Sequence, residues 1–336
     1  MSETRQICLK SRPEGIPTAE NFELRTVSLP PLQDGEVLVR NLFMSVDPYM
    51  RGRMRDAPSY TPPFQIGAAL EGRAIGEVVE SRDPAFRPGD RVRSDYGWRE
   101  QFTTEGRRLL KLPVTEDIPA SAFLGVLGIP GFTAWSGLTQ IGKPQDGETI
   151  FVSGAAGAVG SVVAQMGKIL GCRVIASAGS TEKCDWLTSL GIDHVVNYRT
   201  ETDLLSAVRA GAPDGINVYF DNVGGKHLEV AIELARPFAR FVECGMISAY
   251  NATEPVPGPH NIIMVIGKSL RMRGFIVLEF MPLYDQFVTE MTGWIRAGKM
   301  QWQETVIAGL ENAPEAFIGL FSGRNIGKMV VDLRAG

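Results

Sequence analysis

The sequence predicts an α/β protein in which a doubly wound parallel sheet is inserted in a β-rich, partly open barrel domain. From residue 149 onward, short apolar strands alternate with helices of 3.6-residue period, the rhythm that builds parallel sheets. The first third of the chain instead carries short strands broken by turn residues. The tail, 301–336, returns to strand, short helix and strand, so we expect it to rejoin the first domain.

The 336 residues suit two domains, at roughly 100–200 residues each. We expect a β-rich domain from 1–122 and 298–336 and an inserted domain from 123–297. The first has predicted strands at 6–10, 22–28, 36–44, 73–80 and 91–94, and a proline-rich loop at 53–65. The second has predicted strands at 149–153, 172–178, 194–197, 217–221, 238–245 and 270–277, with helices at 158–170, 181–190, 203–210, 226–235 and 282–297.

Composition excludes several classes of function. The formal net charge is −4 and is spread along the chain, whereas a nucleic-acid binder more often shows a basic excess. No run of about 18 apolar residues occurs, so we expect no membrane span, and the N-terminus lacks the apolar segment of a secretory signal. The four Cys and three His form no closely spaced ligand pairs, so no protein-held zinc is expected. These features are typical of a reduced cytoplasmic protein.

A glycine-rich turn at the first strand–helix junction of the alternating region is the sharpest local signal. Residues 153–160 read S-G-A-A-G-A-V-G, so Ala155 replaces the first glycine of a G-x-G-x-x-G fingerprint. Gly157 would let the backbone approach a pyrophosphate, and Gly160 would let helix and strand pack closely. The helix start offers N–H groups and a positive dipole end to that anion. The turn therefore predicts a dinucleotide site, with a plain tight turn as the alternative.

The end of the next strand distinguishes the two nicotinamide dinucleotides. An NAD site usually places an acid there, which bonds the ribose 2′-hydroxyl, but this strand ends in Ala178-Gly179-Ser180. Lys183 offers a positive charge to a 2′-phosphate, and Tyr198, after the following strand, offers a hydroxyl. A solvated lysine and a surface tyrosine are the alternative. The missing acid favours NADP(H).

Six strings, taken in order along the chain, resemble one branch of a known superfamily. They are S-V-D-P-Y-M-R (45–51), G-I-P-G-F-T-A (128–134), A-A-G-A-V-G-S-V-V (155–163), F-D-N-V-G-G (220–225), C-G-M-I-S-A-Y-N (244–251) and N-I-G-K (325–328). With the domain order, they resemble the zinc-free branch of the medium-chain dehydrogenase/reductase superfamily, which contains prostaglandin reductases (leukotriene B4 12-hydroxydehydrogenases), alkenal double-bond reductases and curcumin-reductase-like enzymes. The resemblance implies a GroES-like first domain, a Rossmann domain that binds NADP, and a homodimer.

The chemistry follows from what the first domain lacks. The zinc-dependent relatives carry a ligand Cys and a G-H-E motif there, whereas this chain has Ser45-Val46-Asp47 and Glu71-Gly72-Arg73 and no His before residue 194. Without a Lewis acid to polarise an alcohol or ketone, an activated C=C bond is the expected target. Hydride addition at the β-carbon puts charge on the conjugated carbonyl oxygen, which needs only a hydrogen-bond donor and then a proton at the α-carbon.

We therefore expect a zinc-independent, NADPH-dependent oxidoreductase that reduces the C=C bond of α,β-unsaturated ketones and aldehydes. Its partners would be a small apolar conjugated carbonyl substrate and a second copy of the chain, with no nucleic acid and no membrane. An NADPH:quinone reductase and a non-catalytic NADP-binding protein are the alternatives.

The predicted catalytic residues are two tyrosines. Tyr49 would bond the substrate carbonyl, with a half-buried tyrosine that supports a loop as the alternative; Tyr250 would contact the cofactor and is a weaker proton-donor candidate. The resemblance implies a cofactor site made of Gly157, Ala158, Val159, Gly160, Lys183, Tyr198, Asn222, Cys244, Gly245, Met246, Ile247, Ser248, Ala249, Tyr250, Phe275, Ile276, Val277 and Asn325. Some eukaryotic members have a second substrate-facing tyrosine where this chain has Gly267, so their substrate specificity is not carried over.

Overall fold

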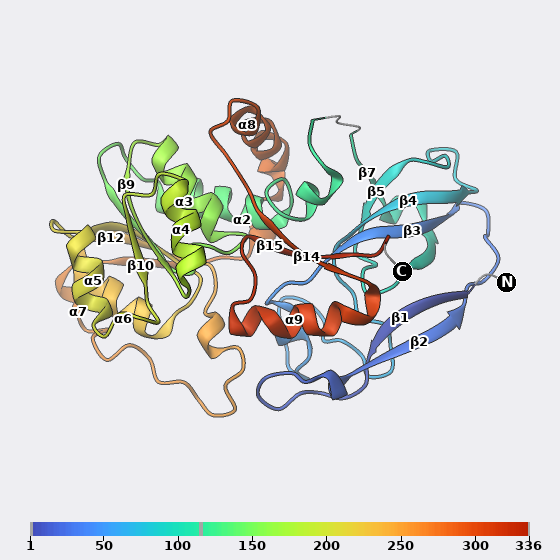
Figure 1. Ribbon diagram of the computed structural model, residues 1–336, viewed down its shortest axis with the longest axis horizontal. Helices are drawn as coiled ribbons and strands as arrows, with labels where there is room; N and C mark the ends of the chain where they lie inside the picture. The colour runs from blue at the N-terminus through green and yellow to red at the C-terminus, as the bar shows by residue number, and fades with distance from the viewer. Residues whose placement is uncertain (1–2, 114–116, 335–336) are drawn as a thin grey trace. The chain divides into compact units, whose positions relative to one another are not determined.

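A computed structural model describes residues 3–113 and 117–334 of the chain (Figure 1). The chain divides into two compact units. The β-rich unit comprises Met1–Leu124 and Glu304–Gly336, and the α/β unit comprises Gly125–Gln303. The sequence analysis predicted junctions after residues 122 and 297.

A seven-stranded sheet organises the β-rich unit. Its order is β14 (Glu304–Ala308), β15 (Lys328–Asp332), β3 (Glu36–Ser45), β4 (Ala74–Ser81), β5 (Arg91–Ser94) and β7 (Leu110–Lys111), and β6 (Gln101–Glu105) also pairs with β3. A separate antiparallel pair is formed by β1 (Glu3–Leu9) and β2 (Phe22–Ser28). Since β15 pairs antiparallel with β3, Val330 opposite Ser45, the tail rejoins the first unit as predicted.

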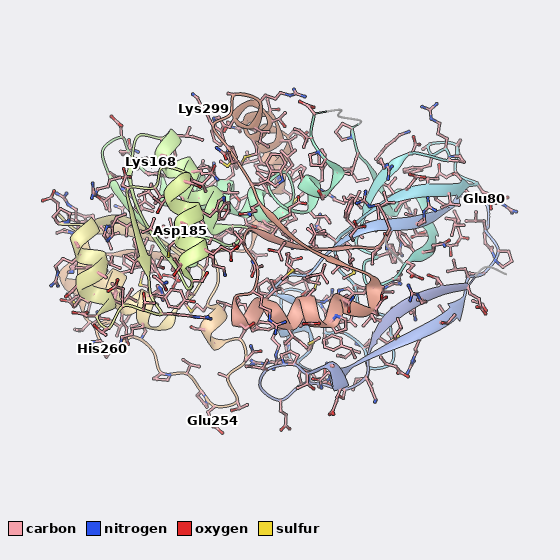
Figure 2. All side chains as sticks on the ribbon, in the orientation of Figure 1. Glu80, Lys168, Asp185, Glu254, His260 and Lys299 are labelled. Carbon is pink, nitrogen blue, oxygen red and sulfur yellow. The ribbon has the colours of Figure 1, made fainter. Side chains whose placement is uncertain are left out.

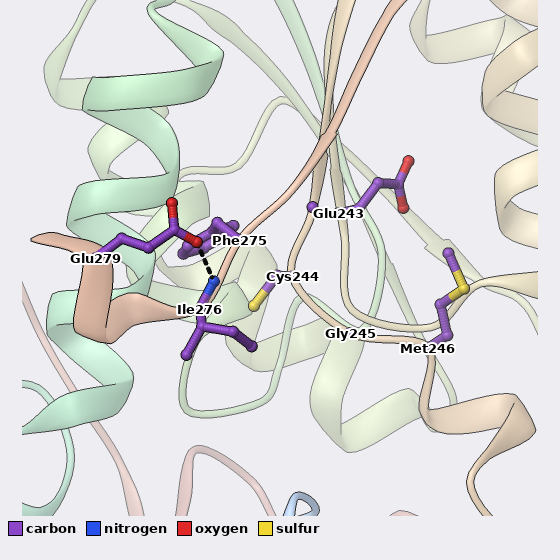
Figure 3. Close-up of a pocket in the computed structure, with 8 residues that line it drawn as sticks. Glu243, Cys244, Gly245, Met246, Phe275, Ile276 and Glu279 are labelled. Atoms are coloured by element: carbon purple, nitrogen blue, oxygen red, sulfur yellow. Dashed lines mark hydrogen bonds between the residues drawn. The ribbon is translucent and has the colours of Figure 1, made fainter. Parts of the chain in front are cut away.

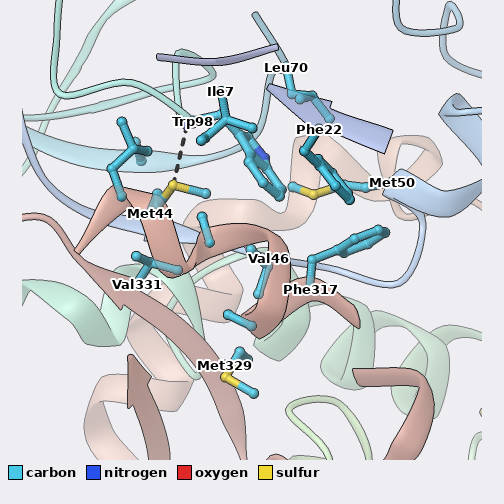
Figure 4. Close-up of a cluster of buried hydrophobic side chains, with 14 of the residues drawn as sticks. Ile7, Phe22, Met44, Val46, Met50, Leu70, Trp98, Phe317, Met329 and Val331 are labelled. Carbon is cyan, nitrogen blue, oxygen red and sulfur yellow. Dashed lines mark hydrogen bonds between the residues drawn. The ribbon is translucent and has the colours of Figure 1, made fainter. Parts of the chain in front are cut away.

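The core of this unit lies between the sheet and α9 (Ala313–Ser322) and includes the side chain of Met50, the first residue of α1 (Met50–Arg53). Trp98 stacks on Phe22 with 5.9 Å between ring centroids and meets Phe317 edge-on at 6.1 Å (Figure 4). Val46 and Met329 belong to the same cluster, so the ends of the segments that carry them are anchored in the core.

The α/β unit is a parallel six-stranded sheet of order β10–β9–β8–β11–β12–β13 (Figure 1). Its strands are β8 (Thr149–Val152), β9 (Arg173–Ala178), β10 (His194–Asn197), β11 (Ile216–Asp221), β12 (Ala235–Glu243) and β13 (Arg271–Gly274). The helices are α2 (Ile129–Ser136), α3 (Gly160–Ile169), α4 (Thr181–Ser189), α5 (Leu204–Gly211), α6 (Gly225–Leu234), α7 (Met264–Gly267) and α8 (Tyr284–Arg296). The strand order reverses between β8 and β11, and ligands of such sheets bind at this switch point.

Several predicted elements differ from the observed ones in their bounds, and one helical region was not predicted. The helix expected from residue 158 begins at Gly160, because residues 157–159 complete the preceding turn. The strand expected over 270–277 ends at Gly274, and a 3₁₀ segment, Val277–Leu283, then leads into α8. Helix α2 and the π-helical turn Gly137–Gly142 were not predicted.

The missed helix has a physical explanation in its glycines. A Cβ on Gly131 would lie 1.9 Å from the Val126 carbonyl oxygen, and one on Gly137 would lie 2.8 Å from the rings of Phe220 and Phe275. These glycines permit close packing, although sequence patterns treat them as helix breakers.

Titratable side chains form pairs on the outer faces of the α/β unit. Lys168 on α3 forms an ion pair with Asp193 at 2.6 Å, and a ring nitrogen of His260 lies 3.2 Å from Glu229. Lys168 and His260 are labelled in Figure 2. Partly exposed pairs of this kind contribute about 0–1 kcal/mol each, so the buried core holds the fold. Within 3–113 and 117–334, no helix has the length and apolar character needed to cross a membrane.

Candidate functional site

The carboxyl ends of the six parallel strands bring most of the predicted cofactor residues to one edge of the α/β sheet. Each strand is followed by one predicted group, and these are Gly157–Gly160 after β8, Lys183 after β9, Tyr198 after β10, Asn222 after β11, Cys244–Tyr250 after β12 and Phe275–Val277 after β13. Tyr49 and Asn325 belong to the β-rich unit.

The glycine turn after β8 is built around Gly154 rather than around the usual first glycine. Gly154 has φ +58°, the left-handed conformation that favours glycine, whereas Ala155 is buried and donates its N–H to the Ser177 carbonyl oxygen at 2.9 Å. Ala155 therefore fits without strain. A Cβ on Gly160 would lie 2.5 Å from the Gly154 oxygen, so only glycine lets α3 start this close to the turn. The start of α3 presents N–H groups to an anion.

A cationic cluster surrounds Gly179 at the end of β9. A Cβ at Gly179 would lie 2.6 Å from the Tyr198 hydroxyl and 3.2 Å from Arg199 Nε. Ser180 caps α4 by accepting the Lys183 N–H at 3.4 Å, which places Lys183 in the first helical turn. Burial and then the nearby Arg199 charge lower the pKa of Lys183. The cluster thus combines the charges of Lys183 and Arg199 with the Tyr198 hydroxyl, next to the backbone of Gly179. Such a group suits a phosphate dianion, so the cluster fits the 2′-phosphate of NADP(H).

Arg199 is the member of this cluster that the sequence analysis missed. It directly follows Tyr198 after β10, and that position was the available signal. The Tyr198 ring meets the edge of His227 with 5.0 Å between ring centroids. Burial lowers the pKa of His227 to about 4, so this support stays uncharged near neutral pH.

Asp221 organises the switch point between β8 and β11. Its fully buried Oδ1 accepts hydrogen bonds from the Ser153 hydroxyl at 2.9 Å, and from the Tyr219 hydroxyl and the N–H groups of Val223 and Gly224 at 2.8 Å each. Asn222 donates its side-chain amide to the Ser153 carbonyl oxygen at 2.8 Å. Asp221 lies in the F-D-N-V-G-G string, but sequence reasoning assigned it no role.

A pocket of about 380 Å³ opens beside the ends of β12 and β13 (Figure 3). Its lining combines backbone and side chains of Glu243, Cys244, Gly245, Met246, Gly274, Phe275, Ile276 and Glu279. On one wall the Ile276 N–H donates to Glu279 Oε1 at 2.9 Å. Five of these residues, Cys244, Gly245, Met246, Phe275 and Ile276, are predicted cofactor contacts, so the pocket belongs to the predicted cofactor site.

Glu243 is an unexpected acid on this pocket wall. It is the register partner of Asp221 across β11 and β12. Both Glu243 carboxylate oxygens and Asp221 Oδ2 are buried, and none of the described groups donates a hydrogen bond to them. Burial, and then the Asp221 charge, raise the pKa of Glu243 to about 8, so Glu243 keeps its proton near neutral pH. The same two causes raise the pKa of the Cys244 thiol to about 12.

Tyr250 lies on the segment that follows β12. A Cβ at Gly245 would lie 2.9 Å from the Tyr250 hydroxyl, so the phenol folds back onto the backbone of the pocket wall. The structure thus brings Tyr250 to the predicted cofactor segment. Its role as a proton donor stays a prediction.

Tyr49 projects from the β-rich unit where β3 gives way to α1. Its half-buried ring packs against the core cluster, and its hydroxyl makes no hydrogen bond with any of the described residues. Burial, and then the Asp47 charge, raise the pKa of Tyr49 above its ordinary value, so the phenol keeps its proton and can donate it in a hydrogen bond. Asn325 donates its amide to the Gly327 carbonyl oxygen at 2.8 Å and so supports the turn before β15.

The chain was compared with known proteins. A family model described as the N-terminal domain of oxidoreductase matches residues 5–112, and one described as zinc-binding dehydrogenase matches residues 158–293. In the described parts of the chain, no three His, Cys, Asp or Glu residues are grouped so that they could hold a metal ion.

Similar proteins match over nearly the whole chain. The NADP(+)-dependent 2-alkenal reductase of Nicotiana tabacum is 44% identical, over 97% of this chain and 96% of its own. Prostaglandin reductase 1 of Mus musculus is 43% identical, over 98% and 99%. The structure of CurA in complex with NADPH, from Vibrio vulnificus, has a TM-score of 0.93 at 42% identity and covers 98% of this chain and 99% of its own. The chain therefore belongs to the medium-chain dehydrogenase/reductase superfamily, in the zinc-free branch of the prostaglandin, alkenal and curcumin reductases.

Proposed function

We propose that this protein is an NADPH-dependent reductase of the C=C bond of α,β-unsaturated ketones and aldehydes. The observation that carries the proposal is the Tyr49 phenol, a protonated donor whose hydroxyl bonds to no described residue. Such a donor can stabilise the oxyanion that forms when a conjugated carbonyl accepts a hydride. The relatives support this choice, since the names of two of them state reduction of an alkenal and of a prostaglandin.

The α/β unit supplies the residues that would hold the cofactor. Gly157–Gly160 would receive the pyrophosphate, and Lys183, Tyr198 and Arg199 the 2′-phosphate. Ribose and nicotinamide would lie along the remaining predicted contacts, namely Asn222, Cys244–Tyr250, Phe275–Val277 and, from the β-rich unit, Asn325. NADPH bound in this way supplies a hydride to the β-carbon of the substrate. The NADPH complex of the similar CurA structure supports the assignment.

The protein's own catalytic contribution would be hydrogen bonding and proton delivery. Tyr49 would donate to the carbonyl oxygen as negative charge develops there, and one such donor is worth about 3–4 kcal/mol in oxyanion-type sites. Tyr250 is the proposed side-chain source of the α-carbon proton, and water and the ribose hydroxyl of the cofactor are the alternative sources. Neither role needs a metal ion.

Product analysis tests this function. Purified protein and NADPH would be mixed with a simple enal, a simple enone and a panel of quinones, and the products identified by mass spectrometry. We expect the saturated aldehyde and ketone. NADPH oxidation with quinones alone, or an allylic alcohol as product, would contradict the proposal.

We also propose that the protein acts as a cytoplasmic homodimer. The edge position of β13 in the six-stranded sheet leaves a strand that a second copy can extend, and the four cysteines are free thiols. Light scattering after size exclusion should give about twice the chain mass of 36.6 kDa. A monomer at micromolar concentration would contradict the dimer, and cell fractionation would test the compartment.

A further inference from the structure

A buried ion pair joins two of the strings that the sequence analysis singled out. Asp47 comes from the D-P-Y-M-R string, and Lys328 closes the N-I-G-K string near the other end of the chain. Lys328 Nζ lies 3.2 Å from Asp47 Oδ1, and the two side chains are only 4% and 19% exposed. Nothing in the proposed chemistry uses either residue directly.

Both members of the pair form further hydrogen bonds. Lys328 Nζ also donates to the carbonyl oxygens of Val46 at 2.9 Å and Met329 at 2.7 Å. The Ser45 hydroxyl donates to the second oxygen of Asp47. Lys328, the first residue of β15, therefore holds the segment that directly follows β3 through one side chain.

These contacts fix the segment from which Tyr49 projects. The carbonyl oxygen of Asp47 accepts the Met50 N–H at 3.1 Å, which shapes the turn that holds Tyr49. On the far side of that turn, the buried Arg51 guanidinium donates to the Gly15 carbonyl oxygen at 2.9 Å. The turn is thus tied down on both sides of Tyr49, whose hydroxyl bonds to none of the residues that the structure describes.

Stability alone is a weak reason for a buried ion pair at this place. Removing two charges from water costs free energy that their attraction often only offsets, and well-packed apolar side chains would do as well. What an ion pair adds over apolar packing is direction, because it fixes the orientation of the groups it joins.

We propose that Lys328, acting through Asp47, is a positioning residue that orients the Tyr49 hydroxyl toward the substrate carbonyl. The inference rests on the proposed role of Tyr49. It predicts that the Tyr49 hydroxyl no longer contributes to kcat once the ion pair is removed. A misoriented hydroxyl cannot donate a hydrogen bond to the oxyanion that forms on the substrate.

A double-mutant cycle tests the inference. One side of the cycle is Tyr49→Phe, and the other is the paired substitution Asp47→Asn with Lys328→Met, which removes both charges and leaves no unpaired buried ion. The kcat and KM for a simple enone, the Kd for NADPH and the Tm would be measured for each variant. Lys111→Met, which breaks the more exposed Lys111–Asp90 pair of the same unit, is the matched control.

We expect each side alone to lower kcat for the enone by about 10- to 100-fold, with the NADPH Kd unchanged. In combination, Tyr49→Phe should add less than a twofold loss to the paired substitution. Fold losses that multiply would overturn the positioning role while leaving Tyr49 in place. An unchanged kcat in Tyr49→Phe alone would overturn both the proposed role of Tyr49 and the inference. A paired variant that melts like the wild type and keeps its kcat would overturn the inference alone.

Discussion

Asp47 follows strand β3 of the β-rich unit, and Asp221 is the last residue of strand β11 of the α/β unit. The two units neutralise these acids differently. In the β-rich unit, Asp47 is matched by the ammonium of Lys328. In the α/β unit, one oxygen of Asp221 accepts four hydrogen bonds. Its other oxygen accepts none from the described residues, and the neighbouring Glu243 holds a proton near neutral pH. The first arrangement balances charge with charge, and the second relies on hydrogen-bond donors and on a proton held by Glu243.

Lys183 and Arg199 of the α/β unit also differ from the Asp47–Lys328 pair of the β-rich unit. Burial, and then the nearby Arg199 charge, lower the pKa of Lys183, so bringing these two cations together works against stability. We therefore expect that an anion bound beside Lys183 and Arg199 would offset the repulsion between them.

The largest expected effect comes from leaving Asp47 without its cation. Lys328→Met should lower the free energy of unfolding by about 3–5 kcal/mol, because a mostly buried carboxylate then lacks its partner. Adding Asp47→Asn should restore most of that loss. Urea denaturation at pH 7 measures both. A double variant as unstable as Lys328→Met would show that packing of the lysine stem, and not charge, is what matters.

The next largest effect concerns the proton that Glu243 holds near neutral pH. Burial and Asp221 raise the pKa of Glu243 to about 8 from 4.5. A raised pKa means that the folded state holds the proton more tightly, so stability is full below about pH 4.5 and falls as pH rises through about 8. Glu243→Gln keeps a donor toward Asp221 but cannot ionise.

The variant should therefore gain about 2–4 kcal/mol over the wild type between pH 5 and pH 9. Denaturation curves across that range, taken as the difference between the two proteins, cancel the titration of His227 and Cys244. Parallel curves for the two proteins would show that Glu243 is ionised throughout.

A smaller effect is expected for Lys183, a cation of the proposed 2′-phosphate site. Lys183→Ala should raise the NADPH Kd and KM by about 10- to 100-fold, since a charge-assisted hydrogen bond to phosphate is worth about 1.5–3 kcal/mol. NADH parameters and the Tm should stay unchanged. Lys168→Ala, on the outer face of α3, is the control. Equal losses for NADPH and NADH would rule out a 2′-phosphate role.

The smallest effect is expected at an uncharged position. A Cβ on Gly267 would meet nothing within 4 Å, and Ile266 beside it is 76% exposed. Gly267→Tyr should therefore change the free energy of unfolding by less than about 0.5 kcal/mol. It should alter KM for bulky enones more than for small ones, which a substrate series measures. A large loss of stability would mean that α7 is packed more tightly than this open space indicates.

Much of the α/β unit could be predicted because its signals are local. The period of residues 160–169 and the glycines at 157 and 160 mark a strand–turn–helix unit, and parallel strands bring whatever follows them to one edge. Lys183 and Tyr198 were found in this way, and Arg199 was available by the same reasoning. The early start assigned to α3 and the late end assigned to β13 reflect turns whose hydrogen bonds sequence patterns do not show.

The sequence by itself determined the class of fold, the return of the tail to the first unit, the family and the nicotinamide cofactor it implies, because periodicity and short motifs encode them within a few residues. Only the tertiary structure decided which charges meet. Lys328 pairs with Asp47 across most of the chain, and Glu243 faces Asp221 through strand register. Both contacts arise from sheet pairing between segments distant in sequence, and a single chain carries no local signal for such pairing.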